Sequence, residues 1–283
     1  MATFRERNDR KNRGEQGSPQ GRDRPGTQGR GHGRPRFHGK REDASGWLWG
    51  RHAVEAALAN PARSGDMRLL ASPERIRELQ PLLARRPGLR AESSDAQELS
   101  RLLPQGAVHQ GLALRAPPLP DISIDDLGEE AAGVIVMLDQ VTDPQNVGAV
   151  LRSCAAFGAR GLVLQERNAP HLSGALAKAA AGAVEKVPCA RVTNLSRALE
   201  RLSDLGWRSV GLAGEAEQTL AQALDARPTV LVLGSEGEGL RRLVSEHCEA
   251  LARIPMPGGF ESLNVSNAAA VALYEFTRQV DLG

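Results

Sequence analysis

The strongest constraint on the fold is an alternation of apolar runs and helical patterns that begins at Gly133. The runs have the near-continuous hydrophobic character of strands buried on both faces, and they occupy 134–139, 162–165, 186–192, 207–213, 229–234 and 250–255. Patterns with apolar residues at helical spacing lie between or after them, at 143–159, 172–181, 194–205, from Leu240 and from Leu263. This alternation predicts an α/β fold with an open parallel sheet and helices on both faces.

A smaller α/β pattern precedes it, at 46–116. Strand-like runs at 67–71, 88–92 and 107–116 alternate with helical patterns at 51–59, 73–86 and 96–104. This region has no cluster of acids, histidines or nucleophiles, so we interpret it as a recognition module. The segment 117–132 is rich in proline and then acidic, which is typical of an interdomain linker. The second domain is therefore predicted to cover 133–283.

The first 45 residues have a different composition. They hold 12 Lys and Arg against 6 Asp and Glu, with almost no apolar side chains, so they cannot bury a core and are predicted to be disordered. The run RGHGRPRFHGKR at 30–41 resembles Arg/Gly segments that bind nucleic-acid backbones. A solubilising tail without a specific ligand explains the same composition equally well.

Several classes of protein are disfavoured by composition. No run approaches the roughly 20 apolar residues that span a bilayer, and the N-terminus lacks the apolar core of a secretory signal. The three cysteines are far apart and lack CxxC spacing, so neither a disulfide framework nor a zinc site is expected. We therefore expect a cytoplasmic protein without a metal centre.

The first motif is LDQVTDPQNVGAVLRSCAAFGA at 138–159. Asp143 and Pro144 form a good helix start, with an N-cap side chain followed by proline in the first turn. Asn146 lies in that turn, and Arg152 lies roughly 9 Å further along the axis at 1.5 Å per residue. An arginine beside an apolar stripe is more often a solvated side chain, but the carboxyl end of a parallel sheet is where such folds bind ligands.

The second motif is LVLGSEGEGL at 231–240. A strand runs into Gly234, Gly237 and Gly239, with the spacing G-x-x-G-x-G instead of the G-x-G-x-x-G of dinucleotide-binding folds, and no Walker lysine follows. The glycines alone are explained by a chain reversal. Glu236 is not needed for a turn, so it is a candidate for orienting a polar ligand or another side chain.

The third motif is IPMPGGFESLNVSNAAAVALYE at 254–275. A Pro/Gly loop leads into an Ala/Val helix, and four small polar residues lie between the two halves: Ser262, Asn264, Ser266 and Asn267. Each of them alone is explained by helix capping. Four polar groups exceed what one cap requires, so the loop is a candidate ligand cradle.

The three motifs in this order and at these spacings resemble the SpoU (TrmH) family of S-adenosylmethionine-dependent RNA 2′-O-ribose methyltransferases, within the SPOUT superfamily. The resemblance covers 46–283. GRHAVEAAL, VHQGLAL and ARVTNLSRALERL most resemble the RlmB-type branch, which modifies a guanosine of large-subunit (23S) ribosomal RNA.

The resemblance implies a C-terminal trefoil knot, a homodimer and an RNA-binding fold for the first module. It implies that S-adenosylmethionine is the cofactor and that RNA, most simply ribosomal RNA, is the partner. By motif position, the polar site would comprise Asn146, Arg152, Glu236, Ser262 and Asn264. The cofactor would contact Leu233, Gly234, Gly239, Ile254, Leu263 and Ser266.

Transfer of a methyl group to a ribose hydroxyl requires in-line alignment, so positioning should dominate catalysis. No His or Lys lies within the three motifs, which leaves Arg152, Glu236 or a substrate phosphate to accept the proton. Guanidinium does not deprotonate readily. Our hypothesis is that Arg152 binds the phosphate and stabilises the developing alkoxide, and that Asn146 and Glu236 hold Arg152 in place.

Three alternatives remain at this stage. In the first, the same reaction has transfer RNA as its target, although the N-terminal module favours a larger structured RNA. In the second, the chain is a non-catalytic RNA-binding assembly factor with the same fold. The complete set of polar motif residues disfavours this second alternative. The third, a nucleotide-dependent oxidoreductase, is disfavoured by the glycine spacing.

Overall fold

The computed structural model describes residues 46–258 and 262–281. The predicted disordered tail, 1–45, lies outside the described residues, as do Gly259 to Glu261 of the third motif. No helix among the described residues has both the length and the apolar character needed to cross a membrane.

The first module contains a four-stranded sheet with the order β1-β4-β2-β3. Strands β2 and β3 are parallel, whereas β4 pairs antiparallel with both β1 and β2. The strands are β1 (Trp47–Trp49), β2 (Arg68–Ala71), β3 (Arg90–Ser93) and β4 (Leu112–Arg115). The helices are α1 (Arg51–Ala59), α2 (Pro73–Glu78), α3 (Gln80–Leu83) and α4 (Ala96–Leu102).

Two elements of this module differ from the sequence prediction. The helix expected over 73–86 is divided at Leu79, which ends α2 and precedes α3. Pro81 has no N–H to donate and its ring clashes with the preceding turn, so it fits only in the first turn of a new helix. The strand expected over 107–116 begins only at Leu112, because Gln110 and Gly111 have positive φ angles of 55° and 78° and turn the chain.

The second sheet has seven strands in the order β7-β6-β5-β10-β8-β11-β9, and every pairing is parallel. The predicted α/β fold with a parallel sheet is therefore confirmed. The strands are β5 (Val134–Leu138), β6 (Gly161–Gln165), β7 (Cys189–Val192), β8 (Arg208–Leu212), β9 (Gln218–Thr219), β10 (Thr229–Leu233) and β11 (Ala250–Arg253).

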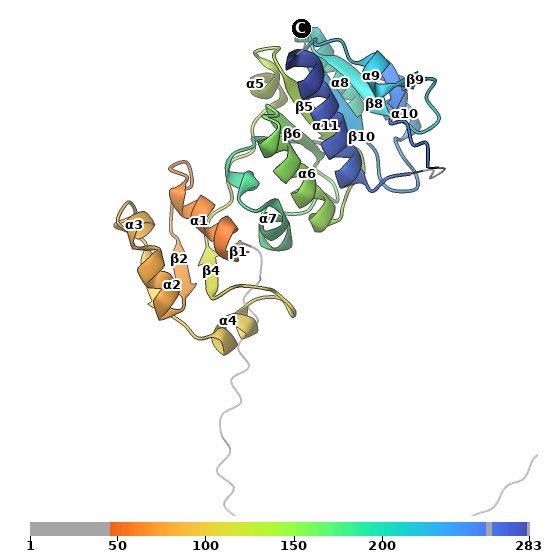
Figure 1. Cartoon of the computed structure of the whole chain (residues 1–283). Coiled ribbons are helices and arrows are strands. Elements are labelled where there is room, and N and C mark those ends of the chain that lie inside the picture. The colour runs from red at the N-terminus through yellow and green to blue at the C-terminus, as the bar shows by residue number, and fades with distance from the viewer. Residues whose placement is uncertain (1–45, 259–261, 282–283) are drawn as a thin grey trace, which may run out of the picture. The chain divides into compact units, whose positions relative to one another are not determined.

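Helices cover both faces of this sheet (Figure 1). One face packs against α6 (Pro144–Ala156), α7 (Gly174–Ala180) and α11 (Val265–Asp281), and α11 lies beside α6. The other face packs against α5 (Ile124–Gly128), α8 (Leu195–Asp204) and α10 (Arg242–Glu246). Two short helices, η1 (Ala183–Glu185) and α9 (Leu220–Ala223), complete the domain.

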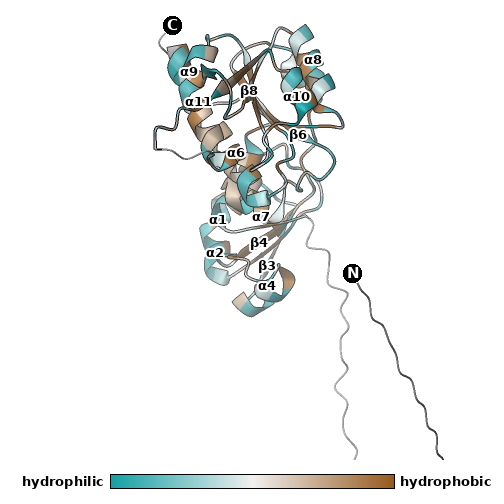
Figure 2. Ribbon diagram, turned by 90° about the vertical axis from the view of Figure 1, so that its right-hand side faces the viewer, coloured by the Kyte–Doolittle hydropathy of each residue, from teal (hydrophilic) through white to brown (hydrophobic). Residues whose placement is uncertain are grey.

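The period-2 alternation of strand side chains divides the core between these two layers. In β5, Val134, Val136 and Leu138 face α6 and α11, whereas Ile135 and Met137 face α8. All five are at most 1% exposed, which explains why this strand is apolar throughout. In Figure 2 the sheet strands accordingly carry the hydrophobic colour, while α8 and α10 also show hydrophilic surface.

The segment predicted as a linker, 117–132, contains α5. Leu127 is 1% exposed within the core beneath α8, and the indole Nε1 of Trp207 donates to the carbonyl of Gly128 at 3.0 Å. Part of this segment therefore belongs to the packed second domain, and the domain boundaries drawn from composition stay predictions.

Candidate active site

Three loops that follow neighbouring parallel strands meet at one edge of the second sheet. They leave β8, β10 and β11 and enclose a cavity of about 310 Å³. Because all strands are parallel, their carboxyl ends lie at the same edge, where open α/β sheets bind ligands. The lining includes Leu212, Ala213, Gly214, Glu215, Leu233, Gly234, Ser235, Glu236, Gly239, Leu240, Ile254, Met256, Ser262, Leu263 and Val265.

The loop after β10 is folded tightly upon itself. A Cβ atom at Gly234 would lie 2.0 Å from the carbonyl carbon of Gly239. Ser235 and Gly239 form an antiparallel bridge, and the N–H of Gly239 donates to the carbonyl of Ser235 at 3.0 Å. Gly237 and Gly239 have φ angles of +88° and +67°, in the left-handed region that favours glycine. The glycine spacing thus serves a compact loop that presents Glu236 outward.

Three polar side chains from the three motifs form one hydrogen-bonded cluster beside this cavity. Asn146 Nδ2 donates to Glu236 Oε1 at 3.1 Å, and Asn264 Nδ2 donates to the same oxygen at 2.5 Å. Asn264 Nδ2 also lies 3.0 Å from Asn146 Oδ1, which accepts from it. We call these residues the Asn–Glu–Asn cluster. Along the chain, Asn146 is 90 positions from Glu236 and 118 positions from Asn264.

Helix starts position both asparagines of the cluster. The Asp143 carboxylate accepts from the backbone N–H groups of Gln145 and Asn146, which fixes the first turn of α6. Asn264 directly precedes α11, and its Oδ1 accepts from the N–H and the hydroxyl of Ser266 at 2.9 and 2.5 Å. Asn264 therefore takes part in both a helix start and the cluster, so capping alone does not account for its contacts.

The eleven predicted site residues are distributed as follows. Seven line the cavity: Leu233, Gly234, Glu236, Gly239, Ile254, Ser262 and Leu263. Asn146 and Asn264 form the cluster with Glu236, and Ser266 supports Asn264. Arg152 is exposed on α6, and its side chain has no hydrogen bond or ion pair with any described residue. The arrangement in which Asn146 and Glu236 hold Arg152 is thus not what the structure shows.

One ion pair near the cavity, between buried Asp139 and partly exposed Arg241, was not predicted from the sequence. Asp139, fully buried at the end of β5, accepts from the Nε of Arg241 at 2.7 Å and from its backbone N–H at 2.9 Å. The Arg241 guanidinium also donates to Gln165 Oε1 at 3.2 Å. We call Asp139 and Arg241 the loop clamp, because they fix the end of the glycine loop to β5. An acid directly after a buried strand was the one available sequence signal.

The cavity is chemically suited to a nucleoside-containing cofactor. Its wall combines apolar side chains, such as Ile254 and Leu263, with the exposed backbone of the glycine loop. Cofactor sites typically have this mixture of apolar surface and a few polar groups. Gly234 leaves no space for a side chain, so backbone lines the cavity there. Among residues 46–258 and 262–281, no group of three acids, histidines or cysteines could hold a metal.

Two family models match the chain. The SpoU rRNA Methylase family matches residues 133–274, half of the sequence. The model for RNA 2′-O ribose methyltransferase substrate binding matches residues 47–121. The chain belongs to the SpoU rRNA methylase family. The family expected from the three motifs is thereby confirmed.

Curated relatives fall into two groups. An uncharacterized tRNA/rRNA methyltransferase of Mycolicibacterium smegmatis is 44% identical over 187 residues, but the match covers only 59% of that protein and 64% of this chain. The chain thus spans about three fifths of the length of this relative. The 23S rRNA (guanosine-2′-O-)-methyltransferase RlmB of Photorhabdus laumondii is 41% identical over 239 residues, covering 97% of that protein and 82% of this chain.

Solved structures share the fold. An RNA 2′-O ribose methyltransferase matches with a TM-score of 0.66 and 27% identity, covering 82% of this chain and 88% of that one. The SpoU methyltransferase AviRb of Streptomyces viridochromogenes, in complex with the cofactor AdoMet, matches with a TM-score of 0.71 and 24% identity over 84% of this chain and 91% of that one.

Proposed function

We propose that this protein uses S-adenosylmethionine to methylate the 2′-hydroxyl of a guanosine ribose in 23S ribosomal RNA. The observation that carries the proposal is the Asn–Glu–Asn cluster, which joins residues of three separate motifs at the rim of a cofactor-sized cavity. Family membership and the RlmB relative with nearly complete coverage support the reaction and the target.

The cofactor's contribution is an electrophilic methyl group on a sulfonium. The ribose oxygen would bond to the methyl carbon as the carbon–sulfur bond breaks and the neutral thioether leaves. The hydroxyl proton would pass to Glu236 or to a substrate phosphate, because a guanidinium does not deprotonate readily. Glu236, fixed by two amide donors, would orient the ribose through its remaining acceptor positions. Arg152 has no partner among the described residues, so its guanidinium is available for a substrate phosphate and for the charge that develops on oxygen.

The proposal includes the quaternary and topological features implied by the family. A trefoil knot would be formed by the loops that line the cofactor cavity.

Val271 and Tyr274 on α11 are 41% and 57% exposed, and the Tyr274 ring contacts Phe157 at a centroid distance of 6.3 Å. Such large exposed apolar side chains on one helix suit a homodimer interface. The first module would bind the RNA, and the protein would act in the cytoplasm, where ribosomes assemble.

A transfer-RNA target is the second candidate, because the Mycolicibacterium smegmatis relative is described as a tRNA/rRNA methyltransferase. The matched substrate-binding module favours ribosomal RNA, since it supplies a second contact for a large structured substrate.

A deletion strain of the source organism tests the proposal directly. Mass mapping of ribose methylation should show one missing guanosine 2′-O-methyl group in 23S rRNA and unchanged transfer RNA. Purified protein with labelled S-adenosylmethionine should restore that methyl group on rRNA from the deletion strain. Loss of a methyl group from transfer RNA alone would reject the ribosomal target, and lack of both cofactor binding and transfer would reject the enzyme.

A further inference from the structure

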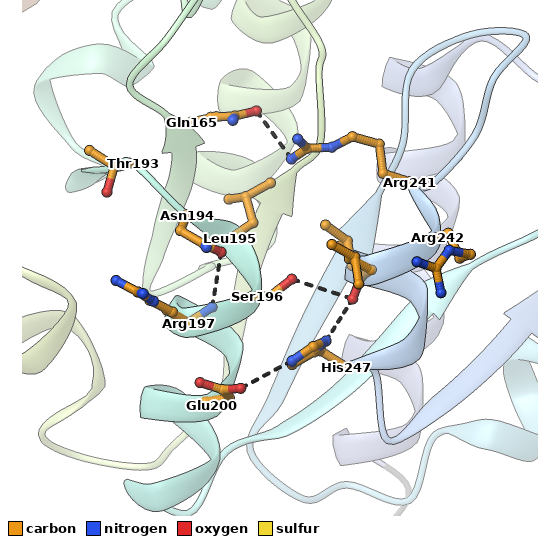
Figure 3. A pocket seen from close by; sticks show the side chains of 12 residues that line it. Gln165, Thr193, Asn194, Leu195, Ser196, Arg197, Glu200, Arg241, Arg242 and His247 are labelled. Carbon is orange, nitrogen blue, oxygen red and sulfur yellow. Dashed lines mark hydrogen bonds and ion pairs between the residues drawn. The ribbon is translucent and has the colours of Figure 1, made fainter.

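A second cavity, of about 620 Å³, lies between α8 and α10 at the carboxyl ends of β6 and β7 (Figure 3). The three motifs do not account for it. We call it the α8–α10 cleft. Its lining residues are Gln165, Thr193, Asn194, Leu195, Ser196, Arg197, Glu200, Arg241, Arg242, Leu243, Val244 and His247.

Among the charged side chains that line the cleft, basic groups outnumber acidic ones. Three arginines line it together with one carboxylate, Glu200, which pairs with His247 at 3.0 Å. The Arg197 guanidinium has no partner among the described residues; only its backbone N–H is used, by the cap residue Asn194. Arg242 pairs with Glu246 at 2.7 Å, but these side chains are 77% and 52% exposed, so solvent screening leaves this pair weak.

Arg241 gives the cleft one fixed positive group. Its guanidinium is held by Asp139 and Gln165, and the Arg241 side chain as a whole is 40% exposed. Figure 3 shows Arg241 extending toward Gln165, with Arg197 and Arg242 at opposite sides of the group. The first turn of α8 adds the positive end of a helix dipole. Guanidinium groups spaced along an open cleft suit an extended polyanion better than one small anion.

The cleft adjoins the candidate active site. Leu240 and Ser245 line the cofactor cavity, whereas Arg241, Arg242 and Leu243 line the cleft. One short segment therefore separates the two cavities, and the loop clamp fixes it to β5. A chain held in the cleft would contact the same segment that follows Glu236.

We propose that the α8–α10 cleft binds the phosphodiester backbone of the RNA substrate, on nucleotides that flank the methylated ribose. This inference rests on the proposed function, which supplies the polyanion. Arg197 and Arg242 contact phosphates, and Leu243, which is 55% exposed, offers apolar surface to a sugar or base. An acidic protein segment is disfavoured, because only one short segment separates the cleft from the candidate active site.

The test is a double variant, R197Q with R242Q, which leaves the loop clamp intact. Binding of 23S rRNA transcripts is measured from low to high salt by filter retention. Each lost phosphate contact should reduce the steepness of log K against log salt by about 0.7, so the double variant should lose about 1.4. At low salt the Kd for RNA and the KM should rise roughly tenfold. The kcat at saturating RNA and the Kd for S-adenosylmethionine should not change.

Arg227→Gln is the matched control. Arg227 is 55% exposed and precedes β10, so it lies at the opposite edge of the same sheet and pairs with Asp225 and Glu249. This variant should keep the wild-type salt slope. Circular dichroism and the Tm verify that all variants are folded.

Two outcomes would overturn the proposal. In the first, the double variant and the control have the same salt slope. In the second, kcat or cofactor affinity falls while the salt slope stays that of the wild type, which would mean that the arginines act on the glycine loop. RNA binding is measured without methyl transfer, so its result stands apart from the proposed reaction. The double variant could show the predicted loss of slope while the wild-type protein transfers no methyl group. That result would contradict the proposed function but support the RNA-binding cleft.

Discussion

Glu236 is the residue on which the candidate site depends. One carboxylate oxygen accepts from two amide groups, one in the first turn of α6 and one directly before α11. Neither amide is charged, so the two contacts fix the orientation of the carboxylate without pairing it with a cation. A side chain held in this way can orient a ribose hydroxyl without moving during the reaction.

Two substitutions of Glu236 test separately the contributions of its charge and of its hydrogen-bond geometry. Glu236→Gln keeps an acceptor oxygen for both amides but removes the charge, and Glu236→Ala removes the acceptor as well. We expect kcat to fall at least about tenfold in the first variant and further in the second, because substrate positioning is lost. Single-turnover methyl transfer measures the effect. Glu217→Gln, which changes an exposed acid outside the cavity, is the control. A wild-type rate for Glu236→Ala would exclude this role.

Asp139 provides a second test at the residue scale. Asp139→Asn leaves the partly buried guanidinium of Arg241 without its counter-charge, and we expect the free energy of unfolding to fall by about 2 kcal/mol. The comparison is Asp225→Asn, whose carboxylate is 44% exposed and pairs with Arg208 and Arg227; this change should cost less than about 1 kcal/mol. Urea unfolding distinguishes the two. Equal losses would show that the loop clamp has no special contribution.

At the scale of elements, the turn after β10 determines the shape of the candidate cofactor cavity. The strand itself is an ordinary buried strand, but its continuation must pass within contact distance of Gly239 and Leu240. Backbone atoms occupy the space that a side chain at Gly234 would need, and backbone cannot move aside as a flexible side chain can. The loop therefore tolerates only glycine at this position.

Gly234→Ala should consequently open the loop. We expect the loss of the Ser235–Gly239 bridge, destabilisation of about 2 kcal/mol or more, and cofactor binding weakened by at least about tenfold. Isothermal titration with S-adenosylmethionine measures the affinity. Gly88→Ala is the control, because a Cβ atom there would meet nothing within 4 Å. Unchanged cofactor affinity in folded Gly234→Ala would contradict the assignment of this cavity.

At the scale of the whole molecule, residues from both modules bury polar groups together. The Arg63 guanidinium pairs with Glu185 at 2.7 Å, and their side chains are 3% and 5% exposed. Asn60 Nδ2 donates to the same carboxylate at 2.8 Å. Removing one partner of a buried pair leaves an uncompensated charge, which is costly. Glu185 therefore links the first module to the second domain.

Core burial also predicts how stability depends on pH. Burial raises the pKa of the Cys189 thiol to about 12, and burial likewise raises the pKa of Cys154. The folded state thus keeps protons that the unfolded thiols, with pKa values near 8.5, release in base. This stabilisation is complete below about pH 8 and is lost as pH rises toward the folded pKa values.

We expect the free energy of unfolding to fall by roughly 1.5 to 2 kcal/mol per buried thiol between about pH 8 and pH 10. The double variant Cys154→Ala, Cys189→Ala should show a correspondingly smaller fall. Urea unfolding at both pH values measures the difference. Identical pH dependence in the variant and the wild type would show that these thiols do not contribute.

The sequence by itself determined the features that arise from local patterns. The helix predicted at 51–59 is α1, since its apolar spacing and the following Asn60-Pro61 define it locally. The apolar strands and the Asp143-Pro144 helix start were accessible for the same reason. The division at Leu79 was missed although Pro81 signals it locally. The helix α5 was missed because the burial of Leu127 depends on what packs around it.

Only the tertiary structure decided which polar residues meet. Periodicity places a side chain on a face or at a helix end, but it carries no information about partners more than 90 positions away. The parallel sheet brings the carboxyl ends of β5, β8, β10 and β11 to one edge, and this joins Asn146, Glu236 and Asn264 while leaving Arg152 outside their hydrogen bonds. Asp139 and Arg241 meet for the same physical reason, across 102 positions of sequence.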